Sequence, residues 1–248
     1  MGTGSRRALA GAVLGFAVAT APLEARADRR YYGETYNAAT SPPGGLDVEL
    51  WSTLHQAPRA GGTQAWRHML ELETGITPRW DVALYNGLRY DQGATTRYEA
   101  TIVETRYRLS DYGEWFVDPV LYFEARKEWV DDRPWAFEGK LILAKDVGRL
   151  NVAVNGSYEI ELIAGGETEH EWAYSAGASY EVVPWVRVGG EAFGAWTRTA
   201  AGTTESAHWA GPALSLAVSR VWLVVAAGWG LTDESEKLRL RAILAFQL

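Results

Sequence analysis

Four histidines are the side chains in this sequence best suited to proton transfer near neutral pH: His55, His68, His170 and His208. Ser206 precedes His208 by two positions, and a serine, a histidine and a carboxylate together can cleave an ester bond. However, the members of such a triad meet through the fold, and the Gly-x-Ser-x-Gly phrase of a nucleophile elbow is absent. The sequence therefore predicts no catalytic residue, and lipid hydrolysis is the least favoured of three functional alternatives.

The segment 167–172, Glu-Thr-Glu-His-Glu-Trp, gathers three carboxylates and one imidazole, and both groups can bind a divalent cation. The spacing of Glu167, Glu169, His170 and Glu171 imposes no coordination geometry. A solvated acidic loop accounts for the same composition. We therefore predict neither a metal site nor a cofactor.

Charge and cysteine content exclude further classes of function. The 248 residues contain 24 Lys and Arg against 31 Asp and Glu, and this net charge of −7 makes nucleic acid an unsuitable partner. The chain has no cysteine, so it has neither a disulfide framework nor a thiolate metal site. Its 12 Trp and 12 Tyr provide far more aromatic surface than a soluble domain of this size needs.

The N-terminus has the pattern of an export signal. Arg6 and Arg7 precede an apolar run over residues 8–23, and the Ala-Arg-Ala of residues 25–27 forms a small-x-small cleavage site. The run is shorter than the roughly 20 residues that a spanning helix requires. We predict a cleaved signal peptide over residues 1–27.

From residue 46 onward, apolar and polar residues alternate in about twelve stretches; Leu150 and Val152, for example, alternate with Asn151 and Asn155. A period of two is that of a β-strand, and stretches of roughly 9–11 residues suit tilted strands that cross a bilayer. Short and longer connections alternate along the chain, as they do in barrels with tight periplasmic turns and longer outer loops. We predict an all-β fold, a closed antiparallel transmembrane β-barrel of about twelve strands over residues 46–248. A soluble barrel or sandwich is the alternative.

Tryptophan positions support the membrane barrel, because amphipathic rings gather at the two membrane interfaces. Four lie just after predicted short turns: Trp80, Trp115, Trp185 and Trp222. Seven lie beside predicted longer loops: Trp66, Trp129, Trp135, Trp172, Trp196, Trp209 and Trp229. We predict that these rings mark the two membrane interfaces.

The last alternating stretch, 236–248, ends on the apolar positions Leu244, Phe246 and Leu248 without a polar tail. This ending resembles the C-terminal assembly signal of Gram-negative outer-membrane barrels, although Leu248 stands where that signal has an aromatic residue. The whole exported chain resembles such a barrel of about twelve strands, of an uncharacterised or porin-like subfamily. The resemblance implies an outer-membrane location, and outer-membrane lipid, lipopolysaccharide and the barrel-assembly machinery as partners.

If the apolar face of each strand meets lipid, the polar face lines the lumen. Strands eight to eleven contribute mainly small inward residues, so we expect one charged wall and one smooth wall. The predicted charged wall comprises Glu49, Glu71, Glu73, Arg89, Glu104, Arg106, Arg108, Glu124, Arg126, Glu138, Lys140, Glu159, Glu161, Arg187, Glu191, Arg239 and Arg241.

Two functions compete for this lumen. Small residues on one wall leave space beside charges of both signs, which predicts a narrow passive channel or uptake pore for small polar solutes. Opposite charges that pair across the lumen would instead close the barrel and leave a structural or loop-interaction role. Residues 28–45 lack alternation and end in a Pro and Gly cluster; we expect a periplasmic segment that can fold back into the lumen, where Arg29 and Arg30 would meet the acidic wall.

Overall fold

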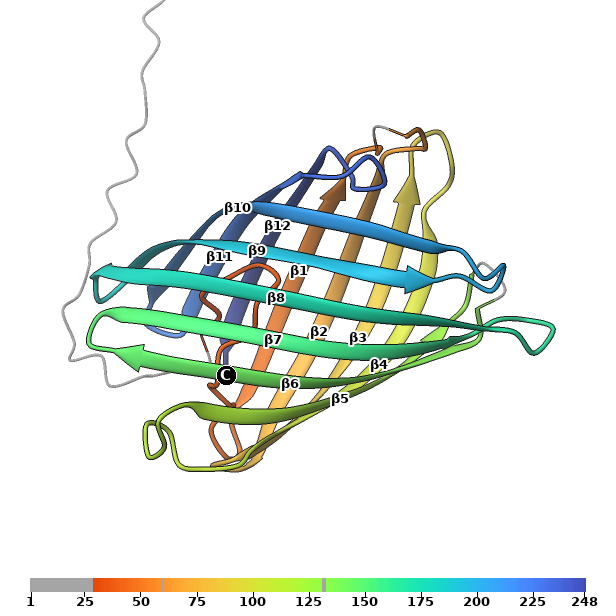
Figure 1. Cartoon of the computed structure of the whole chain (residues 1–248). Helices are drawn as coiled ribbons and strands as arrows, with labels where there is room; N and C mark the ends of the chain where they lie inside the picture. The colour runs from red at the N-terminus through yellow and green to blue at the C-terminus, as the bar shows by residue number, and fades with distance from the viewer. Residues whose placement is uncertain (1–28, 59, 131–132) are drawn as a thin grey trace, which may run out of the picture.

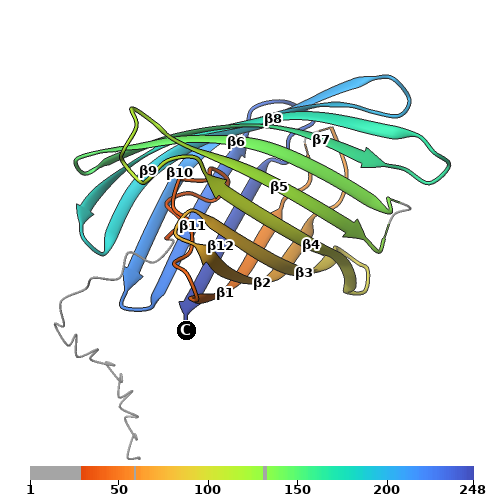
Figure 2. The same cartoon turned by 90° about the horizontal axis from the view of Figure 1, so that it is seen from below.

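The computed structural model describes residues 29–58, 60–130 and 133–248, and the predicted signal peptide over residues 1–27 lies outside them. Twelve strands form one closed antiparallel barrel in which each strand pairs with its neighbours in sequence and β12 closes on β1 (Figures 1 and 2). Within the described residues no helix is long and apolar enough to span a membrane. The strands are β1 (Leu46–His55), β2 (Ala65–Thr77), β3 (Trp80–Asp91), β4 (Arg97–Arg108), β5 (Asp118–Glu128), β6 (Trp135–Val147), β7 (Leu150–Leu162), β8 (Thr168–Val183), β9 (Val186–Arg198), β10 (Thr204–Val218), β11 (Val221–Gly230) and β12 (Leu238–Gln247).

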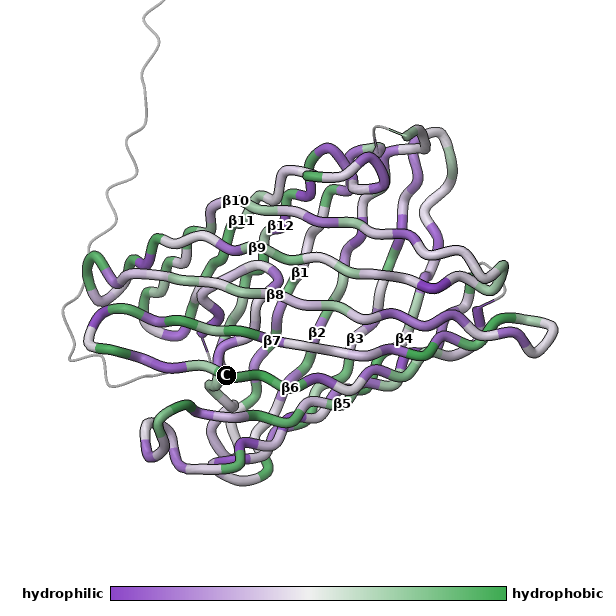
Figure 3. The backbone as a smooth tube through the Cα atoms, in the orientation of Figure 1, coloured by the Kyte–Doolittle hydropathy of each residue, from purple (hydrophilic) through white to green (hydrophobic). Residues whose placement is uncertain are grey.

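Alternation along each strand produces two surfaces of opposite character. In β7 the side chains of Asn151 and Asn155 are buried, whereas Val152 and Val154 between and beside them are exposed. Successive side chains point to opposite faces of a strand, so the buried set lies inside the barrel and the exposed apolar set lies outside. The alternation of polar and apolar residues is visible along many of the strands (Figure 3). An apolar exterior around a polar lumen is the arrangement of a membrane barrel.

The connections differ between the two ends of the barrel. Tight turns at 78–79, 148–149, 184–185 and 219–220 occupy the end where the chain enters β1 and leaves β12, and longer loops occupy the other end. The connection over 109–117 departs from the predicted pattern of short turns, because it is much longer than the others at this end. It is held in place by Lys145 Nζ, which donates to the Trp115 carbonyl, and by Asp118, which accepts the Gly113 N–H.

Residues 29–45 fold back into the barrel, in agreement with the expectation that this segment can enter the lumen. The segment is drawn within the ring of strands in both views (Figures 1 and 2). Tyr32, Ala38 and Ser41 are completely buried. Thr40 reaches the Pro78 carbonyl, which places the segment in the half of the barrel that carries the tight turns. Tyr32 and Ala38 pack with lumen-facing side chains of β5, β6, β7, β10 and β11, so the segment supplies part of the core.

Two of the predicted interface tryptophans point into the lumen and not toward lipid. Trp222 is 2% exposed and packs with Trp51 and Ile243, and Trp209 is 6% exposed. Alternate residues of a strand point to opposite faces, and both tryptophans occupy positions that alternate in step with inward-facing neighbours. The face on which a ring lies therefore depends on its position in this alternation and not on its distance from a turn. Eight of the other predicted interface rings are exposed, and Trp66 is partly exposed; the exposed rings are Trp80, Trp115, Trp129, Trp135, Trp172, Trp185, Trp196 and Trp229.

Candidate functional site

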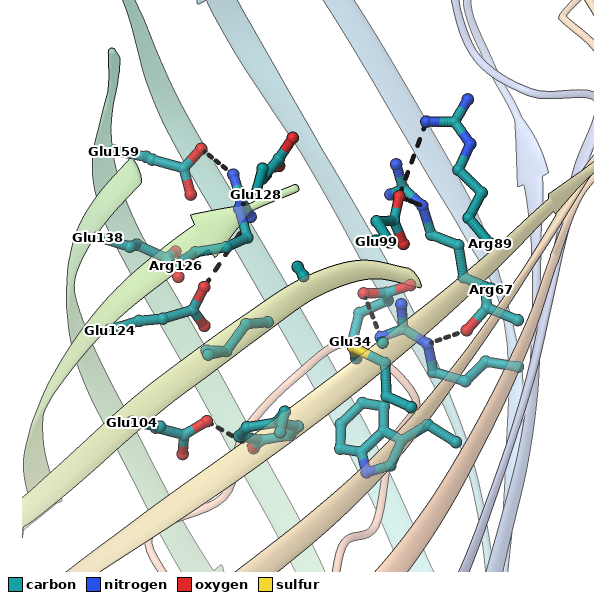
Figure 4. Close-up of a pocket in the computed structure, with 18 of the residues that line it drawn as sticks. Glu34, Arg67, Arg89, Glu99, Glu104, Glu124, Arg126, Glu128, Glu138 and Glu159 are labelled. Atoms are coloured by element: carbon teal, nitrogen blue, oxygen red, sulfur yellow. Dashed lines mark hydrogen bonds and ion pairs between the residues drawn. The ribbon is translucent and has the colours of Figure 1, made fainter. Parts of the chain in front are cut away.

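The outer half of the barrel contains an open cavity of about 650 Å³ with a strongly charged lining (Figure 4). Ten of the residues predicted for the charged wall line it: Arg89, Glu104, Glu124, Arg126, Glu138, Lys140, Glu159, Glu161, Arg239 and Arg241. The remaining predicted residues are buried, mostly beneath this cavity: Glu49, Glu71, Glu73, Arg106, Arg108, Arg187 and Glu191. The structure thus places the predicted charges inside the barrel, but divides them between an open cavity and a closed interior.

Five glutamates form one row across five neighbouring strands of the cavity wall. Glu104 on β4 lies opposite Glu124 on β5, which lies opposite Glu138 on β6. The row continues through Glu159 on β7 to Glu171 on β8. The carboxylates of Glu124, Glu138 and Glu159 offer oxygens within 4.8 Å of one another. Like charges on directly opposite residues destabilise a sheet, so this row costs the fold stability and indicates a function.

Three cations partly neutralise the row, and one of them, Arg106, lies 3.5 Å from Glu104. Arg126 on β5 forms an ion pair of 2.8 Å with Glu159 and another of 3.1 Å with Glu128. Lys140 on β6 lies 3.4 Å from Glu138. Because these cations lie within the same wall as the carboxylates, the three-glutamate cluster already has counter-charges without a metal ion. The row nevertheless contains more carboxylates than the cations beside it can balance.

The opposite side of the cavity carries arginines that are paired with their own acids (Figure 4). Arg67 on β2 lies 2.9 Å from Glu99, and Arg241 on β12 lies 2.7 Å from Glu34 of the N-terminal segment. Arg239 pairs with Glu236 at 2.8 Å. Paired arginines present little free positive charge to a solute, so the unbalanced charge of the cavity is negative.

Below the cavity, the acids and bases of the predicted wall are mutually paired and almost fully buried. Arg106 on β4 forms ion pairs with Glu73 and, at 2.8 Å, with Asp81. The indole N–H of Trp51 lies within hydrogen-bond distance of carboxylate oxygens of both Glu49 and Glu71, at 3.1 and 2.9 Å. These charges hold the barrel together on the side of β1–β4.

The wall of small residues on β8–β11 holds the N-terminal segment, which corrects the expectation that it borders open space. Glu191 on β9 accepts hydrogen bonds from the backbone N–H groups of Gly33, Glu34 and Thr35, at 2.8, 2.9 and 2.9 Å. A Cβ atom at Gly177 would lie 2.6 Å from the Tyr32 ring, so the segment can lie here only because that position is glycine. The small residues therefore accommodate a segment of the chain in the lower half of the lumen.

The two arginines of the segment have different partners. Arg30 lies 3.8 Å from Glu49 and stacks over the rings of Tyr36 and Trp51, at 4.0 and 4.5 Å, as the expected contact with the acidic wall requires. Arg29 does not reach that wall. It donates to the side chain and carbonyl of Ser215 on β10. Tyr36 extends toward the glutamate row and donates to Glu104 at 3.3 Å, which makes it the floor of the cavity.

The upper part of the small-residue wall borders a second cavity of about 280 Å³. Ala173, Ser175, Ala195 and Ala207 line it, together with the inward-facing Trp209. Trp209 stacks on Phe193 with ring centroids 5.3 Å apart, and the Arg239 guanidinium lies 4.0 Å from its ring centre. The predicted space beside the charges is therefore present in the outer half of the lumen.

The histidines do not converge on one site. His55 faces inward and lies 3.0 Å from Glu236, whereas His170 and His208 are on outward-facing positions and contact Tyr158 and Tyr174. The segment 167–172, predicted as an acidic loop, is mostly part of β8. Successive side chains of a strand point to opposite faces, so His170 faces away from Glu169 and Glu171.

No protein-family profile matches the chain, and no curated protein matches it either. Several solved structures have a similar fold. An outer membrane channel from Pseudomonas putida F1 superposes with a TM-score of 0.60 at 11% identity, covering 85% of this chain and 98% of the channel. The NanC porin gives a TM-score of 0.56 at 13% identity, covering 82% and 100%. The KdgM porin, solved with disordered oligogalacturonate, gives 0.53 at 11% identity, covering 82% and 97%. At these identities the likeness shows that the chain has the fold of bacterial outer-membrane barrels.

Proposed function

We propose that this outer-membrane barrel is a narrow passive channel for small polar solutes that prefers cations to anions. The observation that carries the proposal is the row of five glutamates, Glu104, Glu124, Glu138, Glu159 and Glu171, along one wall of the open cavity. Rings and rows of carboxylates attract cations and repel anions in a pore. The porin and channel fold of the structural neighbours supports transport, and the predicted signal peptide supports export before assembly.

The N-terminal segment sets the width of the proposed path. It fills the lower half of the lumen between the small-residue wall and the paired charges, so solute that leaves the cavity must pass beside Tyr36 or displace the segment. This same observation favours the second candidate, a closed barrel with a structural role. The two functions differ in conductance and can be separated by one measurement.

The test is planar-bilayer conductance of the refolded mature chain, residues 28–248, with reversal potentials measured in a KCl gradient. We expect small conductance steps with K⁺ favoured over Cl⁻, and we expect Glu138→Gln with Glu159→Gln to bring the permeability ratio toward one. Glu114→Gln, an exposed position in the connection over 109–117 at the other end of the barrel, is the matched control and should leave the ratio unchanged. Anion preference in the parent protein would overturn the cation proposal.

Removal of residues 28–45 is the second arm of the test. A channel narrowed by this segment gains conductance when it is deleted, because the lower half of the lumen is then open. If neither the parent nor the deleted protein conducts, the closed structural barrel is the better description.

A further inference from the structure

Lys127 is a cation on the outer surface of the barrel. Its strand, β5, directs Leu121 and Phe123 outward and Tyr122 and Glu124 inward, so Lys127 shares the lipid-facing side with the apolar residues. Its Nζ lies 5.3 Å from the Trp129 ring centre and 5.6 Å from that of Trp135. Two tryptophans that flank an outward lysine place it at a membrane interface, where such rings concentrate.

The charge of Lys127 is available to a ligand. Its inward-facing neighbour Arg126 makes three ion pairs, whereas the ion pairs found among the described residues do not involve Lys127. The flanking Trp129 ring is held in place, because its indole N–H donates to Thr101 at 3.2 Å. A fixed aromatic clamp around an unneutralised cation is suited to an anionic group such as a phosphate.

Below Lys127 two glycines occupy outward-facing positions, Gly139 on β6 and Gly156 on β7, and we call the space left by their missing side chains the notch. A Cβ atom at either glycine would meet no other atom within 4 Å, and neither residue has a positive φ. Glycine inside a strand is therefore unexplained here by backbone conformation or by close packing, although it costs the strand roughly 0.5–1 kcal/mol. Such a glycine often marks a place where a ligand approaches closely.

The cation and the notch are spaced as a lipid headgroup and its chains would be. Gly139 lies opposite Phe123, which is four residues from Lys127 along β5, or about 13 Å at the rise of a strand. Gly156 lies opposite Leu141, and Gly139 lies opposite Tyr158, so apolar side chains border the notch. The exposed rings of Phe137 and Tyr158 and the exposed side chain of Leu141 provide apolar surface for an acyl chain.

We infer that this surface binds the lipid A part of lipopolysaccharide, with a phosphate at Lys127 and an acyl chain over Gly139 and Gly156. We choose lipid A because Lys127 lies toward the end of the barrel that carries the longer loops. In a barrel with periplasmic tight turns, that end lies in the outer leaflet. The inference uses only the outer wall. It is independent of whether the lumen conducts.

The experiment is native mass spectrometry of the mature chain in detergent, titrated with diphosphorylated lipid A. We expect one bound lipid A and a roughly five- to tenfold weaker affinity for Lys127→Ala, because one cation near a charged membrane surface contributes on that order. Lys127→Arg should restore binding. Arg149→Ala, which removes an exposed cation in a tight turn at the other end of the barrel, is the matched control and should bind as the parent does.

Two further arms test the notch and the source of the phosphate. A Cβ atom at either glycine would meet no atom within 4 Å, so Gly139→Leu with Gly156→Leu should fill the notch and weaken binding while heat-modifiable gel migration shows an intact barrel. Dephosphorylated lipid A should bind more weakly than the diphosphorylated form. Equal binding of phosphatidylglycerol, or equal loss in Lys127→Ala and Arg149→Ala, would overturn the assignment to lipid A.

Discussion

Glu191→Gln is expected to release the N-terminal segment from the lumen. The Glu191 carboxylate is 5% exposed and accepts three backbone N–H groups, from Gly33, Glu34 and Thr35, with the Thr35 hydroxyl at 3.1 Å as a fourth donor. Hydrogen bonds to a charged group contribute about 1.5–3 kcal/mol each, roughly twice the neutral value. The amide has one acceptor oxygen in place of two and turns its NH₂ toward one of the backbone donors.

The substitution removes one hydrogen bond and weakens the others, so the free energy that holds the segment in the lumen falls by about 3–4 kcal/mol. This loss shifts the ratio of docked to released segment by roughly a hundred- to a thousandfold. The chain has no cysteine, so a single cysteine at Ala38 reports the shift. Ala38 is completely buried when the segment is docked, and reaction with a soluble maleimide then requires release. Labelling of Ala38→Cys should accelerate about a hundredfold or more when Glu191→Gln is added.

The matched control is Glu171→Gln in the same cysteine background, because Glu171 lies inside the same lumen but accepts its hydrogen bond from Thr197 of the barrel wall. Its labelling rate should equal that of the parent. If the two glutamine variants label at the same rate, the carboxylate of Glu191 does not hold the segment and the hydrogen-bond reasoning is wrong.

Three other predictions concern the barrel itself. Arg106→Met leaves Glu73 and Asp81 buried without their cation, so the free energy of unfolding should fall by about 3–5 kcal/mol. The measurement is the urea midpoint of the protein in lipid, which should be lower. An unchanged midpoint would contradict the role of this ion-pair cluster. Deleting residues 246–248 removes backbone pairing with both β1 and β11, so membrane insertion should be lost, and a heat-modifiable band from the truncated chain would refute the assembly signal. Burial alone would raise the pKa of Glu236, but its hydrogen bond with His55 and the charge of Arg239 lower that pKa to about 2. A carboxyl group whose pKa is depressed by folding stabilises the native state above its unfolded pKa of about 4.3, and the contribution is lost as the pH falls toward 2. Thermal stability measured from pH 6 to pH 2 should therefore fall below about pH 4.5, and less so in Glu236→Gln.

The sequence alone determined the strands and the direction of their side chains. A period of two is a local property, so about twelve strands and an inward position for each predicted charge could be derived from neighbouring residues alone. The same reasoning failed for Trp209 and Trp222, which were assigned by their distance from turns. Both tryptophans are separated from inward-facing residues of their strands by an even number of positions, and this spacing was the available signal that they point into the lumen.

Only the tertiary structure decided which inward residues meet. The row from Glu104 to Glu171 exists because five strand registers align, and each register depends on closure of the whole barrel, which no local pattern encodes. The small residues of β8–β11 predicted space inside the barrel. The same local sequence pattern is compatible with water in that space or with another part of the chain. The three N–H groups that meet Glu191 decided in favour of the chain, because a buried carboxylate is stable only with such donors and the segment brings them from more than 150 positions away.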